Sequence, residues 1–268
     1  MSEEKAKYNA STIAEMTGGI ILANFEKDFQ VRETAYQSEA ELERQMIENL
    51  VSQGYERLIV KSNDELYANL KIQIEKLNNI SFSDEEWSRF LIEYLDAPND
   101  GMIEKTRKIQ ENHIHDFIFN DGHLKNIKII DKKNIHNNFL QVTNQVIGEG
   151  TRRNRYDVTI LINGLPLVHI ELKKRGVNLH EAFNQIHRYS KESFNSDNSL
   201  YKYVQIFVIS NGTYTRYFAN TTAQNKNNYE FTCEWADAKN KVIRDLEDFT
   251  KTFFEKRVLL EVLTKYCV

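Results

Sequence analysis

The sequence predicts an α/β (α+β) protein with one central mixed β-sheet flanked by helices. Two observations support this fold class. Segments with the 3.6-residue apolar period of a helix alternate along the chain with short apolar runs that are typical of strands. The most apolar runs form a hairpin around Asn163-Gly164, with helical segments both before and after it. Strands this apolar are usually interior, so we expect helices to cover the sheet.

The composition is that of an ordinary folded chain of 268 residues, long enough for one large domain or two modest ones. Charged residues make up 28%, and the two cysteines, Cys233 and Cys267, have no CxxC or Cys/His spacing. Disulfides and structural zinc are therefore not expected. The N-terminus has no apolar signal-peptide core, and no run of about 18 apolar residues occurs. We expect a cytoplasmic protein that does not cross a membrane.

The first 35 residues lack strong periodicity and are predicted to be an N-terminal extension to a domain over residues 36–268. The first helix of that domain begins at Ser38, which forms a capping box with Glu41, and it ends at Gly54. The segment YERLIV then predicts a strand.

A helical insert is predicted near residues 62–96. Two more capping boxes, Ser62 with Glu65 and Ser83 with Glu86, begin its helices. Beyond the insert, the segments IHDFIFN and IKIIDKKN predict strands that lead into the hairpin.

The part of the chain after the hairpin predicts a helix, two strands and a last helix. The segment NLHEAFNQIHRYSKESF is the helix, capped by Asn178 together with Glu181. The segment YVQIFVISNGTYTRYFAN predicts two strands joined by an Asn211-Gly212 turn. The final helix is expected over about 239–266.

The hairpin RYDVTILINGLPLVHIELKKR carries charged groups at the ends of apolar strands, with Asp157 at the start and Glu171 and Lys173 at the end. Because side chains alternate, Glu171 and Lys173 share one face. A two-residue turn at Asn163-Gly164 would place Asp157 on the other face, whereas a longer loop or a bulge would bring all three together. Pro166 cannot donate a ladder hydrogen bond, which favours the longer loop. We predict the convergent arrangement.

Converging carboxylates indicate a metal site. Burying both as bare anions would cost several kcal/mol, and a bound Mg²⁺ removes this cost while keeping waters for a phosphate substrate. Lys173 beside them could hold or activate a water. The combination suits metal-assisted hydrolysis of a phosphodiester. The alternative is a surface ion pair between Glu171 and Lys173 at a strand end.

Basic residues concentrate around this hairpin. Residues 151–191 hold eight Lys/Arg and three acidic residues, a net charge of +5, whereas the whole chain has a net charge of −4. A basic island in an acidic body is typical of a localised phosphate-binding site. The alternative is a chance cluster on a solvated face.

The hairpin resembles the PD-(D/E)xK nuclease motif as it occurs in the N-terminal endonuclease domain of type I restriction enzyme R subunits (HsdR), which are RecB-like nucleases. One departure is Tyr156, which stands where the motif has proline. The resemblance extends from about residue 36 to the C-terminus and includes YQSEAELERQMIENLVSQGY, DGMIEKTRKIQ, NGLPLVHIELKKRG, EAFNQIHRYSKESF and FVISNGTYTRYFANTT. It implies a restriction-endonuclease-like core and a Mg²⁺-dependent endonuclease that cleaves double-stranded DNA.

The resemblance also implies roles for single residues. Asp157 and Glu171 correspond to metal ligands, and Lys173 corresponds to the catalytic lysine. Gln185 and Tyr189 match the QxxxY motif and would contact DNA. Tyr189 also lies on the apolar stripe of its helix, so a core tyrosine is the alternative.

Four further charged residues are candidates. Lys174 and Arg175 would bind DNA, and Arg188 would contact a phosphate unless it is a solvated arginine. Glu43 on the first helix matches an acid that related nucleases keep near the metal. Glu39, one turn earlier, is its rival, and either could be a solvated helical acid.

The R subunits of this family also carry a helicase-like ATPase motor. The sequence contains no GxxxxGK[ST] motif and no Asp-Glu-x-His strand end, so we expect ATP to be bound only in a full-length enzyme. The chain is expected to be the nuclease module alone, an excised fragment or a truncated subunit. The implied partners are DNA and the methyltransferase (M) and specificity (S) subunits. The alternatives are a stand-alone repair or recombination nuclease, and a catalytically silent scaffold that docks motor to methyltransferase.

Overall fold

A six-stranded mixed sheet is the centre of the computed structural model, with strand order β10-β9-β8-β7-β6-β3. The pairs β8–β9 and β3–β6 are parallel and the other neighbours are antiparallel. The strands are β3 Glu56–Arg57, β6 Leu140–Gly148, β7 Asn154–Ile162, β8 Leu165–Leu172, β9 Ile206–Ser210 and β10 Thr215–Ala219. The structure describes residues 10–14, 22–25, 37–148, 154–190, 194, 199–220 and 228–267. The predicted fold class is confirmed.

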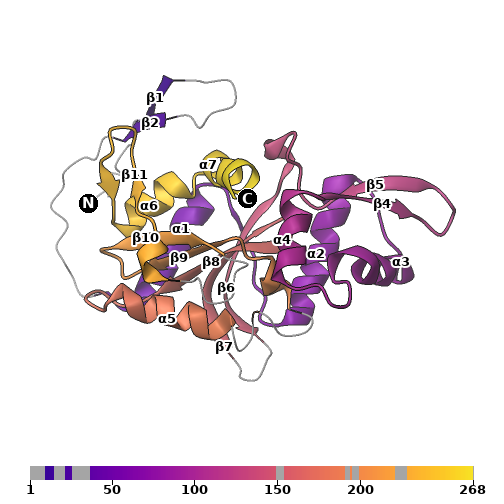
Figure 1. The fold of residues 1–268 in the computed structure, drawn as a ribbon, viewed down its shortest axis with the longest axis horizontal. Helices are drawn as coiled ribbons and strands as arrows, with labels where there is room; N and C mark the ends of the chain where they lie inside the picture. Colours follow the sequence, from indigo (N-terminus) through magenta and orange to yellow (C-terminus); the bar gives the residue numbers. More distant parts are fainter. Residues whose placement is uncertain are drawn as a thin grey trace, which may run out of the picture.

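Helices flank this sheet. They are α1 Glu39–Ser52, α2 Asn63–Asn78, α3 Asp84–Phe90, α4 Met102–Gln110, α5 Leu179–Tyr189, α6 Leu246–Phe253 and α7 Lys256–Glu261. Figure 1 shows α2, α3 and α4 gathered at one end of the molecule, with α5 and α6 at the other. No helix of the described part of the chain is long and apolar enough to cross a membrane.

Within the described ranges, three small sheets complete the fold, each with two antiparallel strands. They are β1 Ala10–Ala14 with β2 Leu22–Phe25, β4 Ile114–Ile118 with β5 Leu124–Lys128, and β11 Trp235–Ala236 with β12 Val242–Ile243. The β4–β5 hairpin lies beside α3, at the same end as the helical insert (Figure 1).

The predicted helix starts in the first third of the chain are confirmed. The side chains of Ser38, Ser62 and Ser83 each accept a hydrogen bond from the backbone N–H three residues later. At Ser83 the Glu86 side chain returns the bond to the Ser83 N–H and completes the capping box. The predicted helical insert is therefore present as α2 and α3, which continues into a π-helical turn over Leu91–Leu95.

Helix α4 was not expected, because the segment after the insert was predicted to pass directly into strands. Its N-cap is Gly101, which has no capping side chain, and the Glu104 carboxylate instead accepts from the Gly101 N–H at 2.9 Å. Its buried residues are Lys105 and Ile109. Because one of the two buried positions is a lysine, the sequence of this helix lacks the apolar period by which a helix is predicted.

The strands before the hairpin also differ from the prediction. The segments IHDFIFN and IKIIDKKN form the separate β4–β5 hairpin, and the strand that pairs with β7 on the side away from β8 is β6, which was not predicted. The first half of strand β6 is buried yet partly polar: Gln141 pairs with the Asn69 amide at 2.9 Å, and Thr143 is also buried. The segment YERLIV contributes only the two residues of β3 to the sheet.

The last predicted helix, over about 239–266, is wrong as a single element. Strand β12 occupies its start, and the chain then forms α6, α7 and a π-helical turn over Val262–Tyr266. The break follows from a cap: the Glu255 side chain accepts from the Val258 N–H at 3.0 Å and begins α7 anew.

The β7–β8 hairpin combines a tight turn with a β-bulge. Asn163 and Gly164 have φ values of 52° and 83°, as a two-residue type I′ turn requires, so the longer loop expected from Pro166 is wrong. Leu161 pairs with Pro166 and Ile160 with Val168, which leaves Leu167 as an extra residue. This bulge shifts the register so that residue 157 comes opposite residue 171, and the predicted convergence is confirmed through the bulge.

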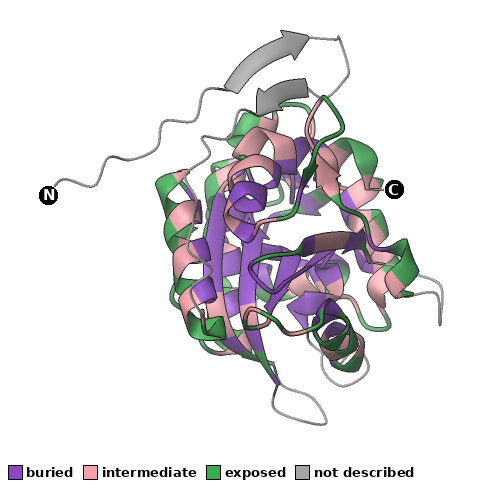
Figure 2. Cartoon of the chain, turned by 90° about the vertical axis from the view of Figure 1, so that its left-hand side faces the viewer, coloured by how far each residue is buried: buried purple, intermediate pink, exposed green. Residues whose placement is uncertain are grey.

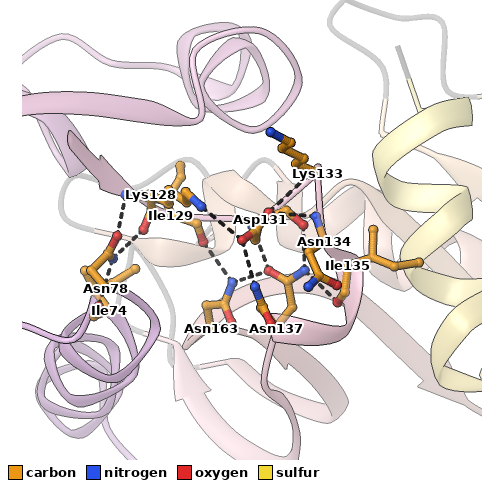
Figure 3. A network of polar contacts seen from close by, with 11 residues as sticks. Ile74, Asn78, Lys128, Ile129, Asp131, Lys133, Asn134, Ile135, Asn137 and Asn163 are labelled. Atoms are coloured by element: carbon orange, nitrogen blue, oxygen red, sulfur yellow. Dashed lines mark hydrogen bonds and ion pairs between the residues drawn. The ribbon is translucent and has the colours of Figure 1, made fainter.

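A polar network holds the turn of this hairpin (Figure 3). The Asn163 Nδ2 atom donates to the Ile129 carbonyl at 3.0 Å and to Asn138 Oδ1 at 2.7 Å. Asn138 in turn donates to the Asp131 carbonyl and accepts from the Asp131 N–H. A Cβ atom on Gly164 would lie 2.7 Å from the Leu70 Cα of α2. The turn is therefore fixed in position.

The Asp131 carboxylate is the centre of the network. Its oxygens accept from the backbone N–H groups of Lys133 and Asn134 and from the side chains of Asn137 and Lys128. Burial raises the pKa of Asp131, but these hydrogen bonds outweigh burial and lower it to about 2.

The core of the protein lies on the two faces of the central sheet. Figure 2 shows the strands buried and the outer faces of the helices exposed. Every residue of β8 is buried, so the functional groups at its end are supported by a rigid, packed strand.

Candidate active site

Asp157, Glu171 and Lys173 meet at the end of the hairpin remote from its turn. Asp157 Oδ2 accepts from the Leu172 N–H at 2.9 Å. Lys173 Nζ donates to Glu171 Oε1 at 3.0 Å and to the Leu172 carbonyl at 3.1 Å. The Asp157 and Glu171 carboxyls are close enough for each to affect the pKa of the other. The structure thus brings together the three predicted catalytic residues.

Burial keeps protons on this carboxyl pair. Glu171 is fully buried and Asp157 is half-buried. Burial, followed by repulsion from Glu171, raises the pKa of Asp157 to about 7. Burial also raises the pKa of Glu171 to about 7, although Lys173 opposes the shift. The pair therefore titrates as a unit and holds protons near neutral pH when no cation is bound.

The donor set fits a hard divalent cation. Glu171 Oε2 is buried, and no donor in the described part of the chain hydrogen-bonds to it. A cation there would offset the repulsion and give this oxygen a partner, and Mg²⁺ binds few protein carboxylates while keeping waters. The described residues contain no group of three or more His, Cys, Asp or Glu placed to hold a metal. The pair would therefore be completed by other oxygen ligands.

Glu43, expected as a third acid of the site, lies beside β6. Its two oxygens accept from the side-chain amides of Asn144 and Gln145, with 2.6 Å between Gln145 Nε2 and Glu43 Oε2. The rival Glu39 is exposed, and its charge is among the causes that raise the pKa of Glu171. The structure therefore gives Glu43 two amide partners, and its role as a metal ligand stays a prediction.

His169 is a residue that the sequence reasoning missed. It is fully buried, and its Nε2 atom lies 3.4 Å from Glu171 Oε2. Burial lowers the pKa of His169 to about 4, so the ring is neutral, and the rings of Tyr156 and Tyr189 contact it edge-on. The available signal was its position two residues before Glu171 on the same strand face.

Gln185 and Tyr189 lie together beside the carboxyl pair. The Gln185 amide donates to the Tyr189 hydroxyl, which donates to the Arg155 carbonyl at 3.2 Å. Tyr189 is buried, and burial, then the charge of Glu171, raises its pKa to about 12. Tyr189 is therefore a core tyrosine whose hydroxyl reaches the site.

The predicted DNA-binding residues differ in exposure. Lys174 and Arg188 are exposed. Arg175 is half-buried: its Nε atom donates to Gln37 Oε1 at 2.8 Å and one terminal nitrogen donates to Thr213 Oγ1 at 3.0 Å. Three other residues of the basic island lie outside the described part of the chain: Arg152, Arg153 and Lys191.

The fold and the site define a class of protein. A mixed sheet that carries two carboxyls and a lysine at the ends of neighbouring strands, with helices on both sides, is a restriction-endonuclease-like core. Residues 36–226 match the family described as "Type I restriction enzyme R protein N terminus (HSDR_N)". The chain belongs to this family.

Curated relatives agree with this assignment. The chain is 56% identical over 257 residues to the "Type I restriction enzyme EcoprrI endonuclease subunit" of Escherichia coli, covering 96% of this chain and 82% of that protein. It is 36% identical over 239 residues to the "Type I restriction enzyme SauMSSORF170P endonuclease subunit" of Staphylococcus aureus (strain MSSA476), covering 87% of this chain and 25% of that protein. The chain therefore spans most of the first relative and a quarter of the second.

Proposed function

We propose that this chain is the DNA-cleaving module of a type I restriction enzyme R subunit and hydrolyses phosphodiester bonds of double-stranded DNA with Mg²⁺. The observation that carries the proposal is the pairing of the half-buried Asp157 with the fully buried Glu171, with the Lys173 side-chain nitrogen 3.0 Å from Glu171. A protein gains nothing in stability from two carboxyls that repel each other where water is largely excluded, so their arrangement favours a catalytic role. Family membership supports DNA as the substrate.

Each residue of the site has a defined part in this proposal. Asp157 and Glu171 would hold Mg²⁺, which supplies positive charge to the phosphate and lowers the pKa of a bound water. The Leu172 N–H and Lys173 fix the two carboxylates before substrate arrives. Lys173 would donate to the attacking water and offset the charge that develops on the phosphorane. Glu43 remains a candidate third ligand.

We assign DNA contact to the surface around the site. The exposed side chains of Lys174 and Arg188 would bind phosphates directly. Arg175, Gln185 and Tyr189 would also contact the DNA. Hydrogen bonds to neighbouring residues already hold their side chains, which favours a precise placement of the DNA strand.

The remaining functions would lie in the full enzyme, which we propose to be cytoplasmic. ATP would be bound by a motor outside this chain and would drive delivery of the DNA. The methyltransferase (M) and specificity (S) subunits would be the partners, and the specificity subunit would read the DNA sequence.

Nicking of supercoiled plasmid tests the proposal. We expect Mg²⁺-dependent nicking that EDTA abolishes, and we expect Asp157→Ala to abolish cleavage while circular dichroism shows an intact fold, because it removes a metal ligand and little packing. Cleavage by Asp157→Ala at the wild-type rate in the assembled enzyme would show that the site is assigned wrongly. If the assembled enzyme cleaves equally well when the residues of this site are substituted, this chain is a catalytically silent scaffold. If this chain cleaves DNA efficiently without any partner subunit, it is a stand-alone nuclease.

Lys173 has its own test in single-turnover cleavage. Losing one donor to a transition-state oxygen typically costs roughly 3–4 kcal/mol, so Lys173→Ala should be about 10²–10³ slower. Lys173→Arg should rescue poorly, because a planar guanidinium replaces a compact ammonium. Near-full activity of Lys173→Ala would remove the lysine from the mechanism, and full rescue by arginine would reduce its role to charge.

A further inference from the structure

Gln145 has an unusual backbone conformation inside β6. Its φ is 57°, in the left-handed region that is costly for residues other than glycine. Its neighbours Asn144 and Val146 keep their places in the antiparallel ladder with β7, so Gln145 lies opposite Asp157 on the adjacent strand. Backbone strain of this kind next to a candidate active site points to a functional constraint.

Hydrogen bonding fixes the orientation of the Gln145 carboxamide. Its Nε2 atom donates to Glu43 Oε2 at 2.6 Å, and since a carboxylate can only accept, the NH₂ group must face Glu43. The Oε1 atom on the other side is buried, and none of the described residues donates to it. Asn144 also donates to Glu43, but its own oxygen accepts from Arg57. Only the Gln145 oxygen of this amide pair is left without a partner within the described part of the chain.

We propose that Gln145 Oε1 is a third protein oxygen of the cation site formed by Asp157 and Glu171, and that Glu43 is the positioning residue that holds the carboxamide. This inference rests on the proposed function, because it adds a ligand to the same site. Amide oxygens are suitable ligands for hard divalent cations, and carboxylates commonly orient such ligands from behind.

The proposal accounts for three observations together. It gives a reason for the strained φ of Gln145 and a partner for its buried oxygen. It also explains how the site is completed although the described residues contain no group of three or more His, Cys, Asp or Glu placed to hold a metal. In this arrangement Glu43 acts on the cation through Gln145, and Gln145 takes the place of Glu43 as the third ligand.

Calorimetric titration of Mg²⁺ into the DNA-free chain measures metal binding separately from cleavage. Gln145→Gly removes the carboxamide and relieves the positive φ, so its melting temperature without metal should be no lower than that of the wild type. Its Kd for Mg²⁺ should rise by about tenfold or more. Wild-type affinity in Gln145→Gly would overturn the inference.

Asn144→Ala is the matched control, since it removes the neighbouring amide from the same Glu43 carboxylate but no unpartnered oxygen. We expect Asn144→Ala to change the Mg²⁺ affinity much less than Gln145→Gly does. An equal loss of affinity in both variants would mean that they act only by disturbing Glu43, and it would contradict the proposal that Gln145 is a ligand. Asp157→Ala separates the two proposals. If it also binds Mg²⁺ normally, the proposed function fails; if it loses binding while Gln145→Gly does not, only the present inference fails.

Discussion

Asp157 and Glu171 lower the stability of the metal-free protein as the pH rises. Their folded-state pKa values are raised to about 7 from 3.8 and 4.5. Below about pH 3 both groups are largely protonated whether the chain is folded or unfolded, so they contribute little. Between about pH 4 and 7 the unfolded chain releases protons first, and the folded state loses relative free energy. The loss is complete above pH 7 and amounts to roughly 2–4 kcal/mol for Asp157.

Calorimetry across pH tests this directly. Asp157→Asn should raise the melting temperature of the EDTA-treated protein at pH 8 and leave it nearly unchanged at pH 4. Added Mg²⁺ should stabilise the wild type more at pH 8 than at pH 5, because protons compete for the same oxygens. Glu93→Gln, which changes an exposed acid of the helical insert, is the control and should show neither effect. A melting temperature of Asp157→Asn at or below the wild-type value at pH 8 would contradict the raised pKa.

At the scale of elements, the contact between the hairpin turn and α2 can be tested with two glycines of similar φ. Gly164 has φ 83° and its Cβ would meet the Leu70 backbone at 2.7 Å, whereas Gly122 has φ 87° and no atom within 4 Å. We expect Gly122→Ala to cost about 1 kcal/mol from φ alone, and Gly164→Ala about 2 kcal/mol more because the turn must move. Urea unfolding gives both values. Equal losses would show that the turn does not depend on its packing against α2.

The Asp131 network should make the same hairpin sensitive to acid. The folded-state pKa of Asp131 is lowered to about 2 from 3.8, so its contribution to stability is present above about pH 4 and is lost as the pH falls through about 2. The contribution is about 1–2 kcal/mol. The difference in unfolding free energy between wild type and Asp131→Ala should therefore be constant from pH 7 to 5 and smaller at pH 3. Asp237→Ala, in a half-buried surface turn, is the control. If the difference in unfolding free energy between wild type and Asp131→Ala is the same at pH 3 as at pH 7, the prediction is refuted.

At the scale of the whole molecule, charge distribution sets the affinity for DNA. A basic island of +5 in a chain of net charge −4 neutralises few phosphates. Binding by this chain should therefore be weak and fall with salt, with a slope of about 0.9 in log K per phosphate contact. Anisotropy titrations of a DNA duplex should show Lys174→Ala reducing that slope by about one. Lys133 is an exposed lysine near the hairpin turn, and Lys133→Ala should leave the slope unchanged. Tight binding that does not depend on salt would show that this surface is not the DNA-binding surface.

Local signals predicted a large part of this fold. Ser38, Ser62 and Ser83 marked their helices because a cap needs only neighbours in sequence. Asp157 and Glu171 could be predicted as site residues because they are charged residues at the ends of apolar strands. Strand β6 was missed because buried polar groups such as Gln141 are satisfied only by tertiary contacts, and those leave no periodic pattern.

Two features of the site had no signal at all. Leu167 forms the bulge, yet an apolar residue within an apolar run looks the same whether or not it is paired. The positive φ of Gln145 could not be predicted from the sequence either, since glutamine has no preference for this conformation. Both depend on neighbouring strands that are distant in sequence.

The bulge at Leu167 makes the site sensitive to chain length rather than to composition. The turn cannot slide, since Asn163 is held by Ile129 and Asn138, so a residue added between turn and site shifts the rest of β8. Inserting one apolar residue between Val168 and Glu171 would leave an apolar strand and the same turn, yet it would rotate Glu171 to the face away from Asp157. Deleting the unpaired Leu167 itself would keep residue 171 opposite residue 157. In this hairpin, libraries of apolar substitutions and the deletion of Leu167 should yield variants that keep the site, whereas single-residue insertions between Val168 and Glu171 should yield folded proteins with no nuclease site.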